Sequence, residues 1–478
     1  MVDFLSSLVL IGLIGQAAIG LGYLISSIWE GEKRASFFAG VQLLGMAGAL
    51  ILFVYWWASG FLETTAGSGI VICLLVGGIA VAVLLIRKTP ANQKALEGAK
   101  GLITGDVKRF DERDIVFARN RTIRPGSEAY KTYYQMRPEY EEFDAARRKK
   151  GGPLGQPGTV DKPKDRPNIA ATFSSQGIAM HLSLPEAYHP AAHPVCKGQQ
   201  VEMSPQEASQ RVKGYTLNIG AKLVGITEIN PLWVYSHRGE IFRENWEDWG
   251  QAIEVHHKYA VVFATEMAFE LVGTAPHTPT TIASMSNYAE GAFIATQLAA
   301  YIANLGYSAT ANHLRHYDTL LVPLAVDAGL GEVGRLGYLM TQDYGPRIRL
   351  SAVTTDLPLV ADRPVDIGVE DFCNMCKKCA SCCPSSSIPM DDRTEVNGTL
   401  RWKLNAETCF DYWGKVGTDC NVCMRVCPWS HANSFPHKVI RAIITRNHLS
   451  RKLFQLMDDI FYGRKPKPKA SPKWAQYE

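Results

Sequence analysis

Three long apolar stretches open this chain. The segments Phe4–Trp29, Ala35–Leu62 and Thr64–Ile86 contain no charged side chain, and each is long enough to cross a bilayer as a helix. The pattern predicts three transmembrane helices in a membrane anchor over residues 1–88. A secretory signal or a buried core helix is the alternative, but the start Met1-Val2-Asp3 has neither a basic region nor a twin arginine.

The charges between these stretches predict an orientation. Lys33 and Arg34 lie in the first loop, Arg87 and Lys88 follow the third stretch, and the second loop has only Glu63. Because cytoplasmic loops carry an excess of basic residues, we expect a multi-pass protein of the cell inner membrane. Its soluble part would lie on the cytoplasmic side.

Polar residues after the anchor predict a stalk and linker over residues 89–168. The basic run Arg147–Lys150 and the Gly- and Pro-rich segment that follows it are typical of an exposed connector. We expect the basic run to be a solvated loop, with contact to anionic membrane lipid as the open alternative.

Short apolar runs then alternate with longer helical stretches. Leu223–Ile226 and Tyr259–Ala264 have the composition of buried strands. The alternation predicts an α/β or α+β domain, which we place at residues 169–365.

One predicted helix of this domain carries a candidate acid. Apolar residues from Ile294 to Leu305 recur at helical spacing and Gly306 follows as a stop signal, so the helix is expected to begin near Ser284. Tyr288 would then lie in its first turn, where the positive end of the helix dipole favours a phenolate. Such a tyrosine could donate a proton, although packing alone would also account for it.

Further polar candidates lie later in the same domain. Arg347 and Arg349 alternate with apolar residues like a strand and share a face. An arginine beside a tyrosine would stabilise its phenolate, whereas a surface or ion-paired arginine is the ordinary alternative. The loop after the helix offers Asn312, His313 and His316.

The segment Gly329–Gly334 formally matches the dinucleotide-binding pattern G-x-G-x-x-G. A Rossmann unit needs a helix directly after the glycines, and here Gly337 and Gly345-Pro346 follow too soon. We expect instead a loop whose bare backbone lets a large cofactor approach Gly329, Gly331 and Gly334.

Eight cysteines predict two iron–sulfur clusters in a domain at residues 366–440. The first run reads C-x2-C-x2-C-x3-C-P and the second also ends in Cys-Pro, as in two-cluster ferredoxins, where the fourth cysteine of a run binds the other cluster. The predicted ligands of the first [4Fe-4S] cluster are Cys373, Cys376, Cys379 and Cys427. Those of the second are Cys383, Cys409, Cys420 and Cys423.

Zinc and disulfides are the alternatives for these cysteines. Zinc ribbons use two pairs of cysteines and need no third cysteine in a run, and disulfide frameworks belong to small secreted chains. Cys382 adjoins a predicted ligand and is expected not to bind iron. The net charge of +4 over 478 residues gives no reason to expect a nucleic-acid partner.

The ordered motifs from residue 306 onward resemble those of the corrinoid-dependent reductive dehalogenases. The resemblance rests on Gly306-Tyr307-Ser308-Ala309, Gly329 to Arg335, Tyr344 to Arg349, and Asp371-Phe372-Cys373 leading into both cysteine runs. It implies an α+β nitroreductase-like corrinoid-binding domain, joined to a two-cluster ferredoxin-like domain. Residues 441–478 would then be a C-terminal extension packing on the catalytic domain.

The resemblance also implies a reaction. A base-off corrinoid of the cobalamin type, as Co(I), would cleave the carbon–halogen bond of an organohalide, with electrons relayed by the two clusters. The family's tyrosine acid maps to Tyr288, its basic residue to Arg347 and its asparagine to Asn312. Arg349 and His313 are neighbours that could take the last two roles.

Several alternatives stay open at this point. An epoxyqueuosine-reductase-like corrinoid enzyme acting on transfer RNA and a non-catalytic membrane iron–sulfur carrier are the rival functions. The electron donor is left open, with a quinol-linked system and a low-potential ferredoxin or flavodoxin as candidates, and a homo-oligomer is compatible with the sequence. Pocket shape, which the sequence does not give, decides which organohalide binds.

Overall fold

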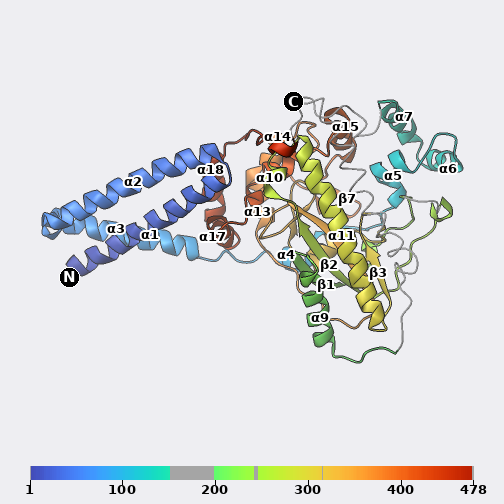
Figure 1. The fold of residues 1–478 in the computed structure, drawn as a ribbon, viewed down its shortest axis with the longest axis horizontal. Helices are drawn as coiled ribbons and strands as arrows, with labels where there is room; N and C mark the ends of the chain where they lie inside the picture. The colour runs from blue at the N-terminus through green and yellow to red at the C-terminus, as the bar shows by residue number, and fades with distance from the viewer. Residues whose placement is uncertain (1, 151–198, 242–245, 315, 476–478) are drawn as a thin grey trace. The chain divides into compact units, whose positions relative to one another are not determined.

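The computed structural model describes residues 2–150, 199–241, 246–314 and 316–475 (Figure 1). The chain forms two compact units. One unit contains Met1–Pro90 and His431–Pro466, and the other contains Ala91–Ser430 and Lys467–Glu478. Residues 151–168 of the predicted linker and the predicted boundary at residue 169 lie outside the described residues.

Three long helices dominate the first unit. They are α1 (Val2–Trp29), α2 (Lys33–Ala58) and α3 (Thr65–Ile86), with mean hydropathies of 2.1, 2.2 and 3.0 over their most apolar windows. The Thr64 hydroxyl caps α3 by accepting a hydrogen bond from the Gly67 amide. All three helices are long and apolar enough to cross a membrane, as the sequence predicted.

Two shorter helices complete this unit, α17 (Phe435–Ile444) and α18 (His448–Phe461). The buried Phe461 packs against Ala35 and Ala39 of α2. This differs from the predicted extension on the catalytic domain, because the face of α18 that contains Phe461 packs on the N-terminal helices instead. Only the segment from Lys467 onward joins the second unit, where the Lys469 amide donates to the Gly273 carbonyl.

The second unit begins with a folded segment where the sequence predicted a stalk. It contains α4 (Gln93–Leu96), α5 (Val116–Arg121), α6 (Glu128–Met136) and α7 (Glu141–Lys150). The predicted solvated run is wrong for Arg147, which is buried and bonded to Asp144, Glu407 and Asp411 at 2.6–2.9 Å. Arg119 pairs with Asp144 and Glu407 as well, so buried ion pairs hold this segment in place.

A four-stranded antiparallel sheet forms the centre of the second unit. Its order is β1 (Leu223–Glu228), β2 (Tyr259–Glu266), β6 (Ile348–Thr355) and β3 (Ala309–Asn312). Alternate residues of β2 point to opposite faces: Val261 and Phe263 pack under α9 (Pro205–Asn218) and α11 (Thr278–Asn304), and Val262 packs against α12 (Leu321–Asp327). Helices on both faces of an antiparallel sheet confirm the predicted α+β architecture.

The ferredoxin-like part follows β6 and consists of short elements. These are α13 (Val369–Cys376), α14 (Lys378–Cys382), the hairpin β7 (Thr394–Val396) and β8 (Thr399–Arg401), α15 (Ala406–Val416) and α16 (Val422–Arg425). A second small hairpin, β4 (Glu332–Val333) and β5 (Leu339–Met340), occupies the glycine-rich segment, so no helix follows those glycines. Helix α10 (Phe269–Val272) precedes α11. The described 3-10 helices are η1 (Phe61–Glu63), η2 (Gly98–Leu102), η3 (Glu112–Asp114), η4 (Pro138–Tyr140), η6 (Pro231–Trp233), η7 (Trp246–Asp248), η8 (Pro428–Ser430) and η9 (Lys473–Ala475).

Candidate functional site

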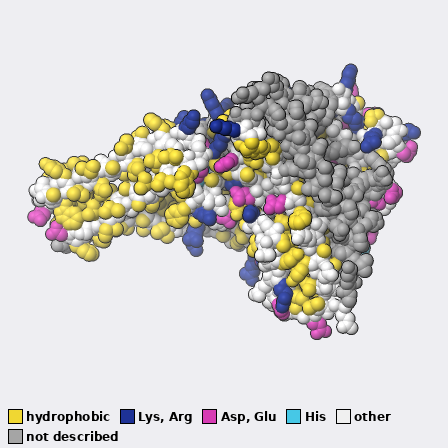
Figure 2. Space-filling model, viewed as in Figure 1, with side chains coloured by type: hydrophobic (Ala, Val, Ile, Leu, Met, Phe, Trp, Pro, Cys, Tyr) yellow, Lys and Arg dark blue, Asp and Glu magenta, His cyan; other side chains and the backbone are white. Residues whose placement is uncertain are grey.

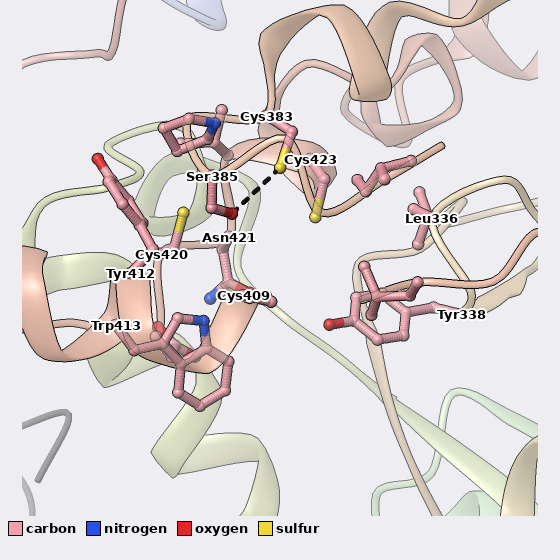
Figure 3. Close-up of a pocket in the computed structure, with 15 residues that line it drawn as sticks. Leu336, Tyr338, Cys383, Ser385, Cys409, Tyr412, Trp413, Cys420, Asn421 and Cys423 are labelled. Atoms are coloured by element: carbon pink, nitrogen blue, oxygen red, sulfur yellow. Dashed lines mark hydrogen bonds between the residues drawn. The ribbon is translucent and has the colours of Figure 1, made fainter. Parts of the chain in front are cut away.

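Four cysteines line one cavity in the ferredoxin-like part. They are Cys383, Cys409, Cys420 and Cys423, the set predicted for the second cluster. The sulfurs of Cys383, Cys420 and Cys423 surround a common space in Figure 3. The structure thus brings together residues that are up to 40 positions apart in the sequence.

The environment of these thiols fits a positively charged metal centre. Burial and the neighbouring Cys420 and Cys409 hold the pKa of Cys423 well above its usual range, so four thiolates need compensating charge here. Burial also acts on Cys383, but hydrogen bonds from Ser385 and the Ser387 amide outweigh it and lower its pKa. Such bonds to sulfur are among the groups that tune iron–sulfur clusters.

The predicted ligands of the first cluster also lie close together. Cys373 and Cys376 come from α13 and Cys379 from α14, with Lys377 between them in a left-handed conformation at φ 50°. Cys427 is buried near all three, and burial followed by their charges raises its pKa well above the usual range. Cys427 therefore lies with the first run of cysteines and not with its own.

The described cysteines form neither a disulfide nor a close-packed group of three ligands. Every cysteine that the structure describes is a free thiol, so none of them forms a disulfide. In the described parts of the chain, no three His, Cys, Asp or Glu side chains approach closely enough to hold a single metal ion. A cubane takes one cysteine at each iron and so accommodates more widely spaced sulfurs than a zinc ion does.

Tyr288 lies on α11, and Arg349 of β6 lies over its ring. The guanidinium carbon is 5.0 Å from the ring centroid, within the range of a cation–π contact. The helix begins at Thr278, six residues before the predicted start, so Tyr288 is beyond the first turn, where dipole effects are concentrated. The positive charge beside Tyr288 is therefore that of Arg349.

A polar network fixes Arg349 in this position. Its Nη2 donates to the Ser284 hydroxyl at 2.8 Å and lies 3.6 Å from the Asp419 carboxylate. Burial would lower the pKa of Arg349, but Tyr288 and Asp419 outweigh it and raise this pKa, so the guanidinium stays charged. Its buried Nε has no hydrogen-bond partner among the described residues and could serve a bound ligand.

Tyr338 connects the cysteine cavity with this network. It lines the cavity (Figure 3), and burial raises its pKa well above the usual range; Cys423 and Cys409 raise this pKa further, and Arg349 opposes them. Tyr338 thus lies close enough to both the second set of cysteines and the Tyr288 site for their charges to act on it. Its own hydroxyl stays protonated.

Arg347 and Asn312 have structural partners in the described part of the chain. Arg347 is fully buried and donates to the Ser430 carbonyl at 2.7 Å, to Met267 at 2.5 Å and to Glu266 at 3.0 Å. Asn312, also fully buried, accepts a 2.8 Å hydrogen bond from the Asp318 amide and so shapes the loop after β3. Residue Leu314 of this loop packs in one cluster with Tyr288, whereas Arg347 contacts different groups from Arg349.

The three predicted cofactor-binding glycines pack against the protein itself. A Cβ on Gly329 would lie 2.4 Å from the Arg363 carbonyl, and one on Gly331 would lie 2.0 Å from the Met340 carbonyl. A Cβ on Gly334 would meet the Met340 side chain at 2.6 Å. These contacts account for the glycines without a cofactor, and their predicted corrinoid role stays a prediction.

Sequence reasoning missed three residues of the site: Ser284, Asp419 and Tyr338. Asp419 directly precedes a cluster cysteine, and Ser284 lies one helical turn before Tyr288. Both signals were present in the sequence, but only the fold shows that they meet at Arg349.

Comparison with known proteins supports this picture of the molecule. The family model of the 4Fe-4S dicluster domain matches residues 372–431, which confirms the predicted two-cluster ferredoxin part. A tetrachloroethene reductive dehalogenase of Dehalobacter restrictus is 33% identical over 309 residues, covering 55% of this chain and 56% of that protein. An epoxyqueuosine reductase of Cyclobacterium marinum is 33% identical over only 120 residues, covering 24% of this chain and 37% of that protein.

The fold gives the same relationship. A solved reductive dehalogenase, whose structure suggests a mechanism for B12-dependent dehalogenation, matches with a TM-score of 0.60 at 25% identity, covering 76% of this chain and 47% of that one. This chain spans about half the length of the dehalogenases it matches, 56% for the Dehalobacter protein. In sequence and in fold it is therefore related to the reductive dehalogenases, as its motifs predicted, and combines the related part with three apolar N-terminal helices.

Proposed function

We propose that this chain is a membrane-bound reductive dehalogenase that removes halide from an organohalide. The observation that carries the proposal is the juxtaposition of a phenol, a charged guanidinium and a set of four cysteines that line one cavity. Replacing a carbon–halogen bond by a carbon–hydrogen bond consumes two electrons and one proton and releases halide. The iron–sulfur clusters held by the cysteine sets would relay the electrons from an external donor, and the phenol would supply the proton.

A corrinoid is the cofactor that this arrangement suits. When bound, it supplies the reduced cobalt that can cleave a carbon–halogen bond. The similarity to a B12-dependent dehalogenase supports this cofactor. The residues of this chain fit such a group in one further respect, because the buried Nε of Arg349 has no partner among the described residues. A cofactor or a substrate beside Tyr288 would provide that partner.

Tyr288 is the proposed proton donor. Its hydroxyl proton would pass to the substrate carbon, and the charge of Arg349 would stabilise the phenolate that remains. Ser284 and Asp419 hold the guanidinium over the ring. The buried Arg347 and Asn312 would act as positioning residues, since one fixes the start of β6 and the other shapes the loop that carries Leu314.

The proposed order of electron flow is supported by the same geometry. The second set of cysteines adjoins Tyr338, which neighbours Arg349, so the second cluster is the proposed immediate donor to the reaction site. The first cluster would feed the second. The proposed external donor is a low-potential ferredoxin or flavodoxin or a quinol-linked system.

The membrane helices would anchor the soluble unit at the cytoplasmic face. Lys33, Arg34, Arg87 and Lys88 flank α2 and α3 at one end, and Glu63 lies at the other. The distribution of basic residues supports this topology.

The first test of the proposal is halide release by anoxically purified full-length protein. A panel of aryl and alkyl halides would be reduced with a low-potential dye, while corrinoid, iron and sulfide are quantified in the same sample. We expect a small amount of protein, relative to the organohalide, to release halide over many turnovers. Corrinoid-loaded protein that releases halide from no member of the panel would contradict the proposal.

Tyr288→Phe tests the proposed proton donor. We expect this variant to retain corrinoid and iron and to lose turnover by about 10²- to 10⁴-fold, because the acid is missing. Tyr301→Phe is the matched control, since Tyr301 lies on the same helix but stacks on Tyr215 at 4.2 Å. If Tyr288→Phe and Tyr301→Phe both turned over at the parent rate, Tyr288 would not be the acid.

Two assays separate this proposal from its rivals. A non-catalytic carrier would contain iron and sulfide but bind no corrinoid under any reconstitution. An epoxyqueuosine-reductase-like enzyme would act on modified transfer RNA and release no halide. The latter is not favoured, because the match to such a reductase covers only 24% of this chain.

A further inference from the structure

Helix α18 carries a row of apolar side chains that its own unit leaves exposed. Leu449, Leu453, Leu456 and Ile460 have exposed fractions of 56, 47, 57 and 42%. Their spacing of three and four residues places them on one face of the helix. Lys452 lies beside this row and is exposed too.

The neighbouring helix α17 repeats the arrangement. Phe435 and Val439 are exposed at 76 and 40%, again four residues apart. Lys438 lies between them and is exposed. Both helices therefore present apolar and basic side chains together on their outer faces.

The opposite face of α18 is fixed within the unit. Phe461 packs against Ala35 and Ala39, and the buried Asp458 pairs with His431 at 2.6 Å. Because these contacts hold the inner face, the outer apolar row cannot turn inward to be covered.

Helix α18 bridges two membrane helices at the same end of the bundle. At its C-terminal end, the Ile460 carbonyl accepts a 2.9 Å hydrogen bond from Arg34, at the start of α2. At its N-terminal end, the His448 amide donates to Thr89, just beyond α3, at 2.9 Å. The start of α2 and the end of α3 lie on one side of the membrane, so α18 runs across the helix ends, where Figure 1 shows α17 and α18 together.

The charges of the first unit are divided between its two ends. Among the described residues at the α18 end, every exposed charged side chain is basic, and Figure 2 shows Lys and Arg gathered there. At the far end the exposed charges are Asp3 and Glu63. The exposed basic residues at the α18 end are Lys33, Arg34, Arg87, Lys88, Lys438, Arg446, Lys452 and Lys465.

We propose that α17 and α18 lie in the plane of the membrane interface and bind anionic lipid. Their apolar rows would enter the boundary between headgroups and acyl chains, and the basic residues would contact lipid phosphates. This inference rests on the proposed membrane anchor. Lipid is the occupant that fits, because the rows are continuous with helices whose own leucines and isoleucines are exposed, and because the exposed charged side chains described around them are basic.

Depth-dependent quenching in nanodiscs tests the proposal on the full-length holoprotein. Leu456→Trp would be compared with the parent chain in nanodiscs containing brominated phosphatidylcholine, with and without phosphatidylglycerol. The matched control is Leu217→Trp, at a leucine on α9 of the second unit that is exposed at 47%. We expect the added tryptophan at position 456 to be quenched several-fold more than that at position 217, and more strongly when phosphatidylglycerol is present.

Each other outcome overturns a defined part of the proposal. Equal, weak quenching at positions 456 and 217 would show that α18 does not contact lipid. The apolar row would then be assigned to a protein partner. Strong quenching at position 456 that does not change with phosphatidylglycerol would show that anionic headgroups do not contribute to binding. Carbonate extraction of native membranes separately tests the anchor, because a chain released by carbonate would contradict the membrane-spanning helices themselves.

Discussion

At the scale of single residues, partners matter more than position in the sequence. Arg347 and Arg349 are two residues apart on a segment that reads as a strand, and the alternation predicted that they share a face. In the fold, Arg347 bonds to backbone carbonyls and Glu266, whereas Arg349 lies over Tyr288. No periodicity in the sequence distinguishes these two environments.

Lysine substitutions should separate the two arginines. Arg349→Lys keeps the charge but loses the planar group over the ring, so we expect turnover to fall by roughly 10- to 100-fold with little change in thermal stability. Arg347→Lys loses buried hydrogen bonds to Ser430 and Met267 and should cost roughly 2–4 kcal/mol of folding free energy. Halide-release kinetics and thermal melting of both variants measure this, and the reverse pattern would assign the proton-donor partner to Arg347.

Glu112 should make the stability of the second unit depend on pH. Its carboxylate is buried and accepts a 2.7 Å hydrogen bond from the Gly239 amide. Burial raises its pKa from 4.5 to about 7, against the opposing effects of Arg238 and that amide. A raised folded-state pKa favours the protonated form, so this stabilisation is complete below the unfolded-state pKa and is lost as the pH rises through 7.

Glu112→Gln removes this titration. We expect the parent to lose up to roughly 3 kcal/mol of stability from this group between pH 4.5 and pH 8, and the variant to lose correspondingly less. Denaturant unfolding of parent and variant at several pH values checks the difference. Identical pH profiles for the two proteins would show that Glu112 titrates normally.

At the scale of secondary structure, the elements with strong apolar patterns were predicted well. The three N-terminal helices and strands β1 and β2 follow from runs of apolar residues that few other structures accommodate. The start of α11 was missed because its first turn, including Thr278 and Pro279, is buried and shows no amphipathic period. The helices at residues 91–150 were missed because ion pairs with Glu407 and Asp411, distant in sequence, hold them.

Gly329→Ala tests the packing reason for the glycine-rich segment. Gly329 has φ +74°, and a Cβ there would lie 2.4 Å from the Arg363 carbonyl, so we expect a loss of at least roughly 1–3 kcal/mol in folding free energy. Gly214→Ala is the control, because it lies in α9 with no atom within 4 Å of the added Cβ and should be neutral or stabilising by about 0.5–1 kcal/mol. A Gly329→Ala variant with parental stability but reduced corrinoid content would instead support the predicted cofactor contact.

At the scale of the whole molecule, the cysteine spacing predicted the two-cluster ferredoxin part, which the family match at residues 372–431 confirms. The predicted second set lines one cavity, and Cys427 lies near Cys373, Cys376 and Cys379. The site around Tyr288 could be predicted only in part, because Ser284, Asp419 and Arg349 come from α11, the cluster loop and β6. Tertiary packing brings these segments together, and no local sequence pattern indicates that they are in contact.

Cys420→Ser and Cys382→Ser form a matched pair in the ferredoxin-like part. Loss of a ligand at Cys420 should lower the iron content from about eight to about four or fewer per chain, whereas Cys382→Ser should keep about eight. Iron and sulfide analysis with low-temperature electron paramagnetic resonance measures both. Equal iron content in the two variants would exclude Cys420 as a ligand.

The predicted exchange of one cysteine between the two runs would make metallation and folding interdependent. With Cys427 near Cys373 and Cys379, and Cys383 sharing a cavity with Cys420, neither run would carry a full coordination set. A nascent chain could therefore not complete its first cubane until the segment around Cys427 had been synthesised and had docked. Cofactor insertion would then act as a late checkpoint in biogenesis, and truncation within the second run would leave both metal centres unfinished.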